Sequence, residues 1–441
     1  MKLSVHRLFE PVDNAPLILF RICFGFLITA EAWGAILTGW VKANFVDPTV
    51  PLQFIDFRWL KPLPSDGMYY YFIIMGIAGV MVMLGLYYRA AMTTYAIMWS
   101  VVYLMQKTSY NNHYYLLMLL CMVMIFLPAN AYKSLDVRLK PSIKKLTCPR
   151  WCIWFFVVQV SIVYIYASIA KIYPDWLRAD PISIWFDAKS SYPIIGPVLQ
   201  FEWVRWGVAY GGIMFDMLIA PAMLWRRTRV YAFWVAVFFH LFNSAVFQIG
   251  IFPFLGIALF VFFFEPETIR RIFFKKKPTT SFDGLHLYDT SKPLVYLFAI
   301  WFAIQIALPL RHLMFPGNAN WTEEGHRLSW HMMLRAKNGY VRFIVKDPST
   351  GEEWKVRPTE FLTKKQARVI AIRPDMCWQF VQFLKQKYQE EGREKVEIYA
   401  KGKARLNKRP YQDIYDSNVD LASVEWKKFE HADWIVPLRD E

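Results

Sequence analysis

Long apolar stretches recur along most of this sequence and decide what it can fold into. Of its 441 residues, 56% are hydrophobic and only 20% are charged. About 20 apolar residues cross the hydrocarbon core of a membrane as one helix. The pattern predicts a polytopic α-helical membrane bundle of about nine spans, in which the fourth is short and the seventh and eighth are nearly continuous. The predicted spans are residues 15–38, 68–87, 90–106, 114–129, 151–171, 204–225, 230–248, 250–265 and 293–310.

Basic residues are distributed unevenly over the segments between these spans. If the N-terminus is cytoplasmic, the basic segments 133–150, 226–229 and 270–277 all lie on the cytoplasmic side. Cytoplasmic loops of membrane proteins are enriched in Lys and Arg, so the pattern indicates this orientation. The net charge of +16 then reflects anchoring to anionic lipid and not nucleic-acid binding. An odd number of spans places the C-terminal segment outside the cytoplasm.

From Arg311 onward the composition is that of a water-soluble domain. Two alternating stretches flank the turn "PSTG", which is a hairpin signal, and Pro374 separates two helical patterns. We therefore expect a transmembrane catalytic domain over residues 1–310 and a small extracytoplasmic α+β domain over residues 311–441. The expected strands are 339–347, 352–358 and 395–406, and the expected helices are 363–372 and 377–392.

Ionisable side chains inside membrane spans are costly and tend to mark functional sites. Arg21 and Glu31 lie in the first predicted span, and Asp216 lies in the sixth. The simplest interpretation of all three is a structural ion pair or a hydrogen bond to another helix. Lys171 ends the fifth span, where a lysine usually extends to the lipid headgroups. A lone membrane histidine such as His240 is usually an interhelical hydrogen-bond partner.

The position of the polar residues favours a shared site over these separate structural roles. The stretch "KTSYNNHYYLL" (107–117) gathers several hydrogen-bonding groups between two apolar spans. In the predicted topology, its polar residues and those of two later spans lie at outer helix ends or in outer halves. We expect six side chains to converge on the side that carries the soluble domain: Lys107, Asn112, His113, Lys171, His240 and Asn243.

Seven stretches form an ordered series over most of the chain, up to Trp426. They are "LGLYYR" (84–89), "KTSYNNHYYL" (107–116), "ASIAKIYPDW" (167–176), "GGIMFDM" (211–217), "FHLFNSAVFQIGIF" (239–252), "SWHMML" (329–334) and "IYDSNVDLASVEW" (414–426). In this series the sequence resembles the vitamin K-dependent γ-glutamyl carboxylase family, whose membrane part is also called the horizontally transferred transmembrane domain.

The resemblance implies an enzyme that converts peptide glutamate to γ-carboxyglutamate, with vitamin K hydroquinone, O2 and CO2 as co-substrates and no metal. The family's lysine before "xxxDW" corresponds to Lys171, which would deprotonate the hydroquinone. Only an unprotonated amine can do so, and burial at an apolar helix end disfavours the charged ammonium. The family's "NNH" motif implies that Asn112 and His113 lie beside the quinone. His240 and Asn243 are expected to bind it in the same pocket.

The chain also departs from the family pattern. Vertebrate carboxylases are longer, and their additional outer-domain material helps to recognise substrate propeptides, so the sequence does not support that mode of recognition here. Those relatives also join their first outer loop to the globular domain by a disulfide. Residues 39–67 contain no cysteine that would pair with Cys377. These features favour a bacterial inner-membrane homologue over a protein of the endoplasmic reticulum.

Two other functions stay open from the sequence. One is vitamin K epoxidation without protein carboxylation, because one half-reaction can be lost. The other is a quinone-binding membrane protein without turnover, in which Lys171 would be dispensable. An iron-dependent desaturase would need clustered histidines and a transporter would show paired broken helices, and the sequence shows neither. The expected partners are a glutamate-containing protein or peptide and membrane lipid, and the oligomeric state is left open.

Overall fold

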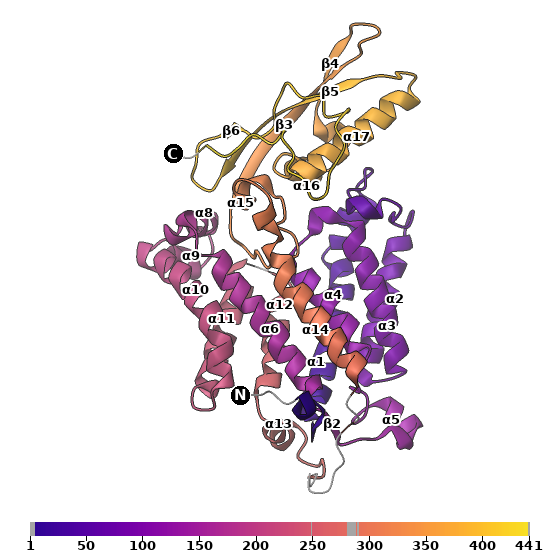
Figure 1. Cartoon of the computed structure of the whole chain (residues 1–441), viewed down its shortest axis with the longest axis vertical. Helices are drawn as coiled ribbons and strands as arrows, with labels where there is room; N and C mark the ends of the chain where they lie inside the picture. Colours follow the sequence, from indigo (N-terminus) through magenta and orange to yellow (C-terminus); the bar gives the residue numbers. More distant parts are fainter. Residues whose placement is uncertain (1–4, 248, 280–287, 289–290, 440–441) are drawn as a thin grey trace.

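The computed structural model describes residues 5–247, 249–279, 288 and 291–439. A bundle of long helices forms one end of the molecule, and a region with a four-stranded sheet forms the other (Figure 1). The principal bundle helices are α1 (Ala15–Leu37), α2 (Gly67–Leu84), α3 (Tyr88–Met105), α4 (Asn112–Met124), α6 (Trp151–Ala170), α10 (Glu202–Leu224), α11 (Arg229–Phe247), α12 (Phe252–Leu259), α13 (Pro266–Phe273) and α14 (Lys292–Ala307). Shorter elements join them: β1 (Pro11–Asp13), α5 (Leu135–Leu139), β2 (Thr147–Pro149), α7 (Pro174–Leu177), α8 (Asp180–Asp187), α9 (Ile195–Leu199) and α15 (Ala319–Thr322).

Six helices in the described part of the chain are long and apolar enough to cross a membrane, which indicates a multi-pass membrane protein. They match six of the predicted spans, although residue 248, the last of the predicted seventh span, lies outside the described residues. A seventh crossing exists if the segment from α12 to α13 counts as one span, but this segment bends by 117°. The prediction of nine spans is therefore not confirmed.

Helices α3 and α4 correspond to the other two predicted spans, which do not qualify as membrane-spanning helices in the structure. Arg89, Thr93, Thr94 and Ser100 make α3 too polar to pass as a span on hydropathy. Helix α4 has 13 residues. At 1.5 Å per residue such a helix is about 20 Å long, shorter than the hydrocarbon core of a bilayer. Helix α3 is therefore long enough but too polar, whereas α4 is apolar but too short.

Helix α1 packs closely along α2 because glycines remove side chains at their contact. A Cβ atom added to Gly25 would lie 2.3 Å from the backbone nitrogen of Met83, and one added to Gly76 would lie 2.0 Å from Nε1 of Trp33. Tyr95 of α3 then donates a hydrogen bond of 2.9 Å to the carbonyl of Ile28. These contacts fix α1 against α2 and α3.

The end of the molecule that carries the sheet, residues 311–439, is called the outer region below. It is built on an antiparallel sheet with the strand order β4-β3-β5-β6. The strands are β3 (Lys337–Lys346), β4 (Glu353–Val356), β5 (Glu397–Leu406) and β6 (Gln412–Asp413), and the helices are α16 (Lys364–Ile370) and α17 (Pro374–Glu390). Phe343 of β3 lies opposite Val356 and Ala400, and its ring contacts Phe380 of α17 at 5.2 Å between centroids. The three expected strands and the two expected helices are confirmed, whereas the domain boundary at residue 310 stays a prediction.

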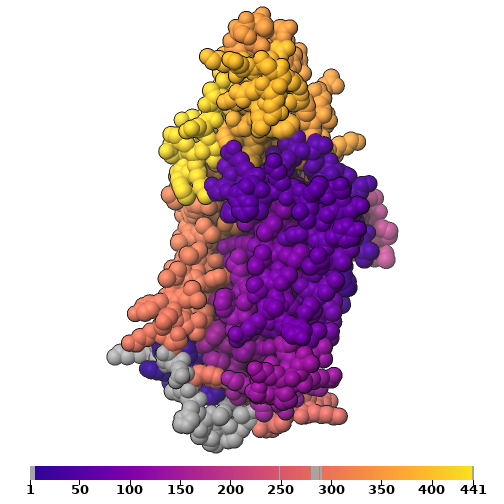
Figure 2. Space-filling model, turned by 90° about the vertical axis from the view of Figure 1, so that its right-hand side faces the viewer, coloured from indigo at the N-terminus to yellow at the C-terminus, as the bar shows by residue number. Residues whose placement is uncertain are grey.

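The core of the outer region also includes residues from the loop between α1 and α2. Val50 and Leu52 are 3% and 1% exposed and belong to the same apolar cluster as the sheet and α17. Gln366 donates a hydrogen bond of 2.6 Å to the carbonyl of Val50, and Gln379 donates one of 2.9 Å to that of Gln53. Figure 2 shows this N-terminal part of the chain, in indigo, directly below the orange and yellow outer region.

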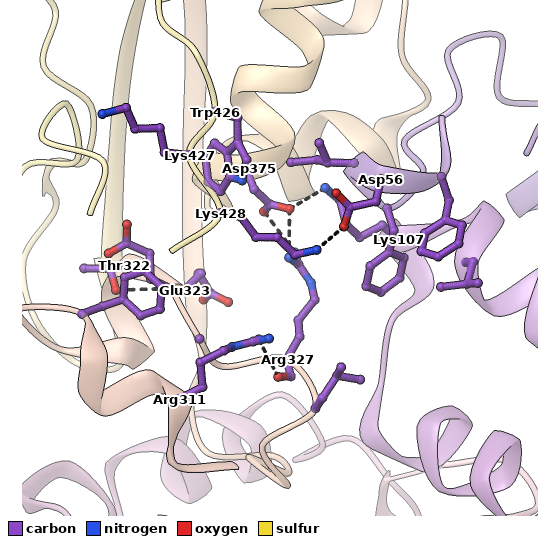
Figure 3. Close-up of a pocket in the computed structure, with 18 of the residues that line it drawn as sticks. Asp56, Lys107, Arg311, Thr322, Glu323, Arg327, Asp375, Trp426, Lys427 and Lys428 are labelled. Atoms are coloured by element: carbon purple, nitrogen blue, oxygen red, sulfur yellow. Dashed lines mark hydrogen bonds and ion pairs between the residues drawn. The ribbon is translucent and has the colours of Figure 1, made fainter. Parts of the chain in front are cut away.

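A buried ion cluster adds to this junction between the bundle and the outer region (Figure 3). Asp375 contacts Lys107 Nζ at 2.5 Å and accepts hydrogen bonds of 2.8 and 3.0 Å from Arg327. Burial lowers the pKa of Lys107 to about 8, against the effect of the carboxylate. Burial would raise the pKa of Asp375, but Arg327 and Lys107 hold it well below its usual range. Asp375 is therefore ionised and joins two cations from different parts of the chain.

Candidate active site

The structure brings Lys171, His113, His240 and Asn243 together around one small cavity of about 100 Å³. Lys171 follows the last residue of α6, His113 lies in the first turn of α4, and the other two lie on α11. The remaining walls are mostly apolar and aromatic, and they include Trp176, Trp185, Phe239, Phe247 and Phe252. A pocket with apolar walls and a few convergent polar groups is the usual form of a small-molecule site.

Lys171 is held inside this cavity by Asp216 of α10. Its Nζ atom lies 2.5 Å from Oδ2 of Asp216 and donates a second hydrogen bond of 3.1 Å to the carbonyl of Ala167. Lys171 is 8% exposed and Asp216 is 4% exposed. The interpretation of Lys171 as a lysine that extends to the headgroups is therefore wrong, and the expected interhelical ion pair of Asp216 is confirmed.

The two histidines are fixed by aromatic and hydrogen-bonding contacts. The His113 ring stacks on Phe252 with centroids 3.8 Å apart. Nε2 of His240 lies 2.8 Å from the hydroxyl of Tyr164. A Cβ atom at Gly256 of α12 would lie 2.6 Å from the His240 ring, so glycine at this position makes room for the imidazole. Both rings are thus held in place from neighbouring helices before any ligand binds.

Asn112 and Lys107 do not line the Lys171 cavity. Asn112 donates a hydrogen bond of 2.9 Å to the carbonyl of His331 and accepts one of 2.8 Å from the hydroxyl of Tyr110. It faces an adjacent cavity toward the outer region. Lys107 belongs to the buried ion cluster with Asp375. Four of the six side chains expected to converge therefore line one cavity, and Asn112 and Lys107 do not. Lys107 lies elsewhere because the loop before α4 turns it toward α17.

The adjacent cavity has a volume of about 250 Å³ and is lined by basic side chains of the outer region. Arg335, Lys337 and Arg373 all face it, together with one carboxylate, Glu323. Arg335 Nε donates a hydrogen bond of 2.9 Å to Glu323. Burial would raise the pKa of Glu323, but the cations, Arg335 first, hold it well below its usual range. The cavity, called the basic cavity below, therefore carries more positive than negative charge.

Two buried nitrogen atoms of the basic cavity have no hydrogen-bond partner within the described residues. They are Nδ1 of His331 and Nη1 of Arg373. Burial lowers the pKa of His331 to about 3, so its ring is neutral at pH 7. Burial also lowers the pKa of Lys337 to about 7. An unpaired buried donor is costly, and an anionic ligand would satisfy Nη1 of Arg373.

A third cavity, of about 580 Å³, meets the other two at the start of α4. His113 and Met333 line all three cavities. The third cavity is lined by Glu31 of α1, together with Tyr114 of α4 and Ile251. The expected bond from Glu31 to another helix stays a prediction. His113 consequently stands where an apolar site, a basic site and a larger space adjoin.

Two family models match the chain. Residues 9–267 match the HTTM domain, and residues 290–441 match the vitamin K-dependent gamma-carboxylase lumenal domain. The chain belongs to this carboxylase family. No solved structure matches it. The first match covers the chain from α1 to α12, with Lys171 and His113, and the second covers α14 and the outer region, with the cations of the basic cavity.

In this carboxylase-family chain, the three cations of the basic cavity are not predicted from the sequence. Arg335 and Lys337 adjoin the motif "SWHMML", but Arg373 comes from the turn between α16 and α17. Charges near a strand usually face water, so only the fold shows that these three line one buried site. Within the described residues, no group of three His, Cys, Asp or Glu side chains is arranged to hold a metal ion.

Proposed function

We propose that the chain carboxylates glutamate side chains of peptides in a reaction that depends on vitamin K hydroquinone. The observation that carries this proposal is the junction at His113 between the Lys171 cavity and the basic cavity. One cavity offers a buried amine among apolar walls, which suits a quinone ring. The other offers basic side chains, among them Arg373 with an unpaired buried N–H, which suit a carboxylate. Carboxylation requires that these two ligands meet.

In this proposal, Lys171 is the base that removes a proton from the hydroquinone, and His240 and Asn243 orient the ring. Asn112 lines the basic cavity next to His113, so its predicted place beside the quinone requires a ring that reaches the junction. The third cavity supplies room for the part of the vitamin K hydroquinone beyond its ring, since this cavity shares Phe252 with the Lys171 cavity. The hydroquinone, on reaction with O2, supplies a base strong enough to remove the γ-proton of glutamate and leaves as the 2,3-epoxide.

The substrate glutamate would enter from the outer region. Its carboxylate would pair with Arg335, Lys337 and Arg373, which places its γ-carbon toward His113. His113 would then assist the proton transfer or the capture of CO2 by the carbanion. Water would quench a carbanion, so the aromatic walls of the adjoining cavity serve to exclude it. We further propose that this face is extracytoplasmic and that the protein resides in a bacterial inner membrane.

The test measures both products at once. Purified protein in detergent receives reduced vitamin K, 14C-bicarbonate and a glutamate-rich peptide, and label incorporation and epoxide formation are followed together. We expect both in the parent protein and neither in Lys171→Ala. Lys401→Ala is the control, because Lys401 is exposed on β5 and lines none of the three cavities. A folded parent protein that yields neither product from intact hydroquinone contradicts the proposal.

One observation favours a second candidate function, epoxidation without carboxylation. The Lys171 cavity and the basic cavity are distinct and share only a few residues around His113, Met332 and Met333. Quinone chemistry could therefore continue in a chain that no longer binds peptide. Epoxide without incorporated label, with several glutamate-rich peptides, would support this candidate. A non-catalytic quinone-binding protein would give neither product, and Lys171→Ala would then change nothing.

A further inference from the structure

Asp216 has the closest polar contact with Lys171, and the proposed function leaves its role open. Two contacts between α6–α7 and α10 fix its position: Ser168 donates a hydrogen bond of 3.1 Å to the carbonyl of Ile213, and Trp176 donates one of 3.0 Å to that of Ala209. The Trp176 ring also lies against Lys171, with its centroid 5.6 Å from Nζ. The carboxylate and the amine are therefore held together by two helices.

The surroundings of this pair contain few other groups that can exchange a proton. Among the described residues that line the cavity, Lys171 is the only amine or guanidinium and Asp216 the only carboxylate. The other titratable groups are His113 of α4, His240 of α11 and Tyr164 of α6. Tyr164 is already bonded to His240. Asp216 is consequently the nearest acceptor for a proton that leaves Lys171.

We propose that Asp216 accepts the proton of Lys171 and so generates the free amine that the hydroquinone requires. This inference rests on the proposed function. A buried ion pair loses much of its hydration, so the neutral pair of amine and carboxylic acid becomes accessible in such a site. In the first step, the Nζ–H bond breaks and the Oδ2–H bond forms. In the second, the hydroquinone O–H bond breaks and the Nζ–H bond forms again.

After these steps, the hydroquinone anion lies beside the lysyl ammonium, and Asp216 carries the second proton. Net charge is conserved, and no other oxidant or reductant is needed. One proton must leave to solvent before the next cycle. Asp216 is in this sense a positioning residue, because it acts on the substrate only through Lys171.

The proposal predicts a specific change in the pH dependence of epoxide formation. In the parent protein, one proton is shared within the pair, so Lys171 is freed by an internal transfer that does not depend on pH. In Asp216→Asn, Lys171 must release its proton to solvent. The acid limb of the pH–rate profile should therefore move to higher pH by at least one unit, which is about a tenfold loss of rate below the limb. Asp216→Glu should restore the parent profile.

The control is Asp187→Asn, which removes a carboxylate with a 59% exposed side chain that pairs with Arg205 at the outer surface. Its profile should match that of the parent. If the limb of Asp216→Asn stays in place or moves to lower pH while the protein is folded, Asp216 is a structural or purely electrostatic partner and the inference is overturned. Absence of epoxide in the parent protein would instead contradict the proposed function, so the two failures are distinguishable.

Discussion

Replacement of Asp375 by Asn tests whether the buried ion cluster holds the outer region on the bundle. Its carboxylate lies 2.5 Å from Lys107 and accepts hydrogen bonds of 2.8 and 3.0 Å from Arg327. The side chains of Asp375, Lys107 and Arg327 are 8%, 1% and 14% exposed. An amide of the same shape leaves two buried cations without a counter-ion. Removal of one partner from a buried pair costs about 3–5 kcal/mol.

Thermal unfolding in detergent, together with limited proteolysis of the outer region, measures this cost. Asp375→Asn should lower the unfolding midpoint by several degrees. The control Glu430→Gln removes an ion pair with Lys427 whose side chains are 61% and 63% exposed, and it should leave the midpoint unchanged. Addition of Lys107→Met to Asp375→Asn should recover part of the loss, because one uncompensated cation disappears. An Asp375→Asn protein that unfolds and is cleaved like the parent would refute the reasoning.

Three further predictions concern the site and its pH dependence. Gly256→Ala should lower the free energy of unfolding by about 1–3 kcal/mol and reduce epoxide formation, because the added Cβ would displace His240. The control is Gly211→Ala, whose Cβ would meet no atom within 4 Å. Both variants are compared with the parent by thermal unfolding and by epoxide formation. Because burial lowers the pKa of Lys337 to about 7, the KM for a glutamate peptide should rise as the pH passes through 7, and Lys337→Gln should abolish this rise in initial-rate measurements. The pKa of Asp375 is held below its usual range, so its contribution to stability is present at neutral pH and is lost as the pH falls below about 4. Unfolding midpoints should therefore fall with acid less steeply in Asp375→Asn than in the parent.

The elements that the sequence predicts best are those with an unambiguous period. Strand β3 alternates in burial as far as Phe343, and α1 combines a long apolar run with Pro16 at its start, so both are confirmed. Helix α4 is apolar as well, but its 13 residues are set by where the chain turns. That turn depends on contacts with distant segments, such as the hydrogen bond from Leu328 N–H to the Tyr110 hydroxyl and the one from Asn112 to the carbonyl of His331.

The residues of the candidate site also fall into those that the sequence predicts and those that it does not. His113, Lys171 and His240 are conspicuous in sequence because polar groups in apolar spans are costly, and the structure brings them together. Lys107 is equally conspicuous, yet it points to the outer region, since its partner Asp375 lies far along the chain. Arg373 gives no signal, because an arginine at a helix start is ordinary. Long-range pairing is therefore what the sequence alone does not supply.

Val50 and Leu52 have a consequence for the order of synthesis. A chain folds progressively from its N-terminus as it is made, so these two residues emerge long before the strands that cover them. The loop between α1 and α2 must therefore wait, with its apolar side chains uncovered, until the sheet and α17 have been completed. For the same reason, residues 311–441 produced by themselves would expose the surface that this loop covers. A preparation of the outer region for binding studies needs the loop supplied with it, either as a fused segment or as a peptide.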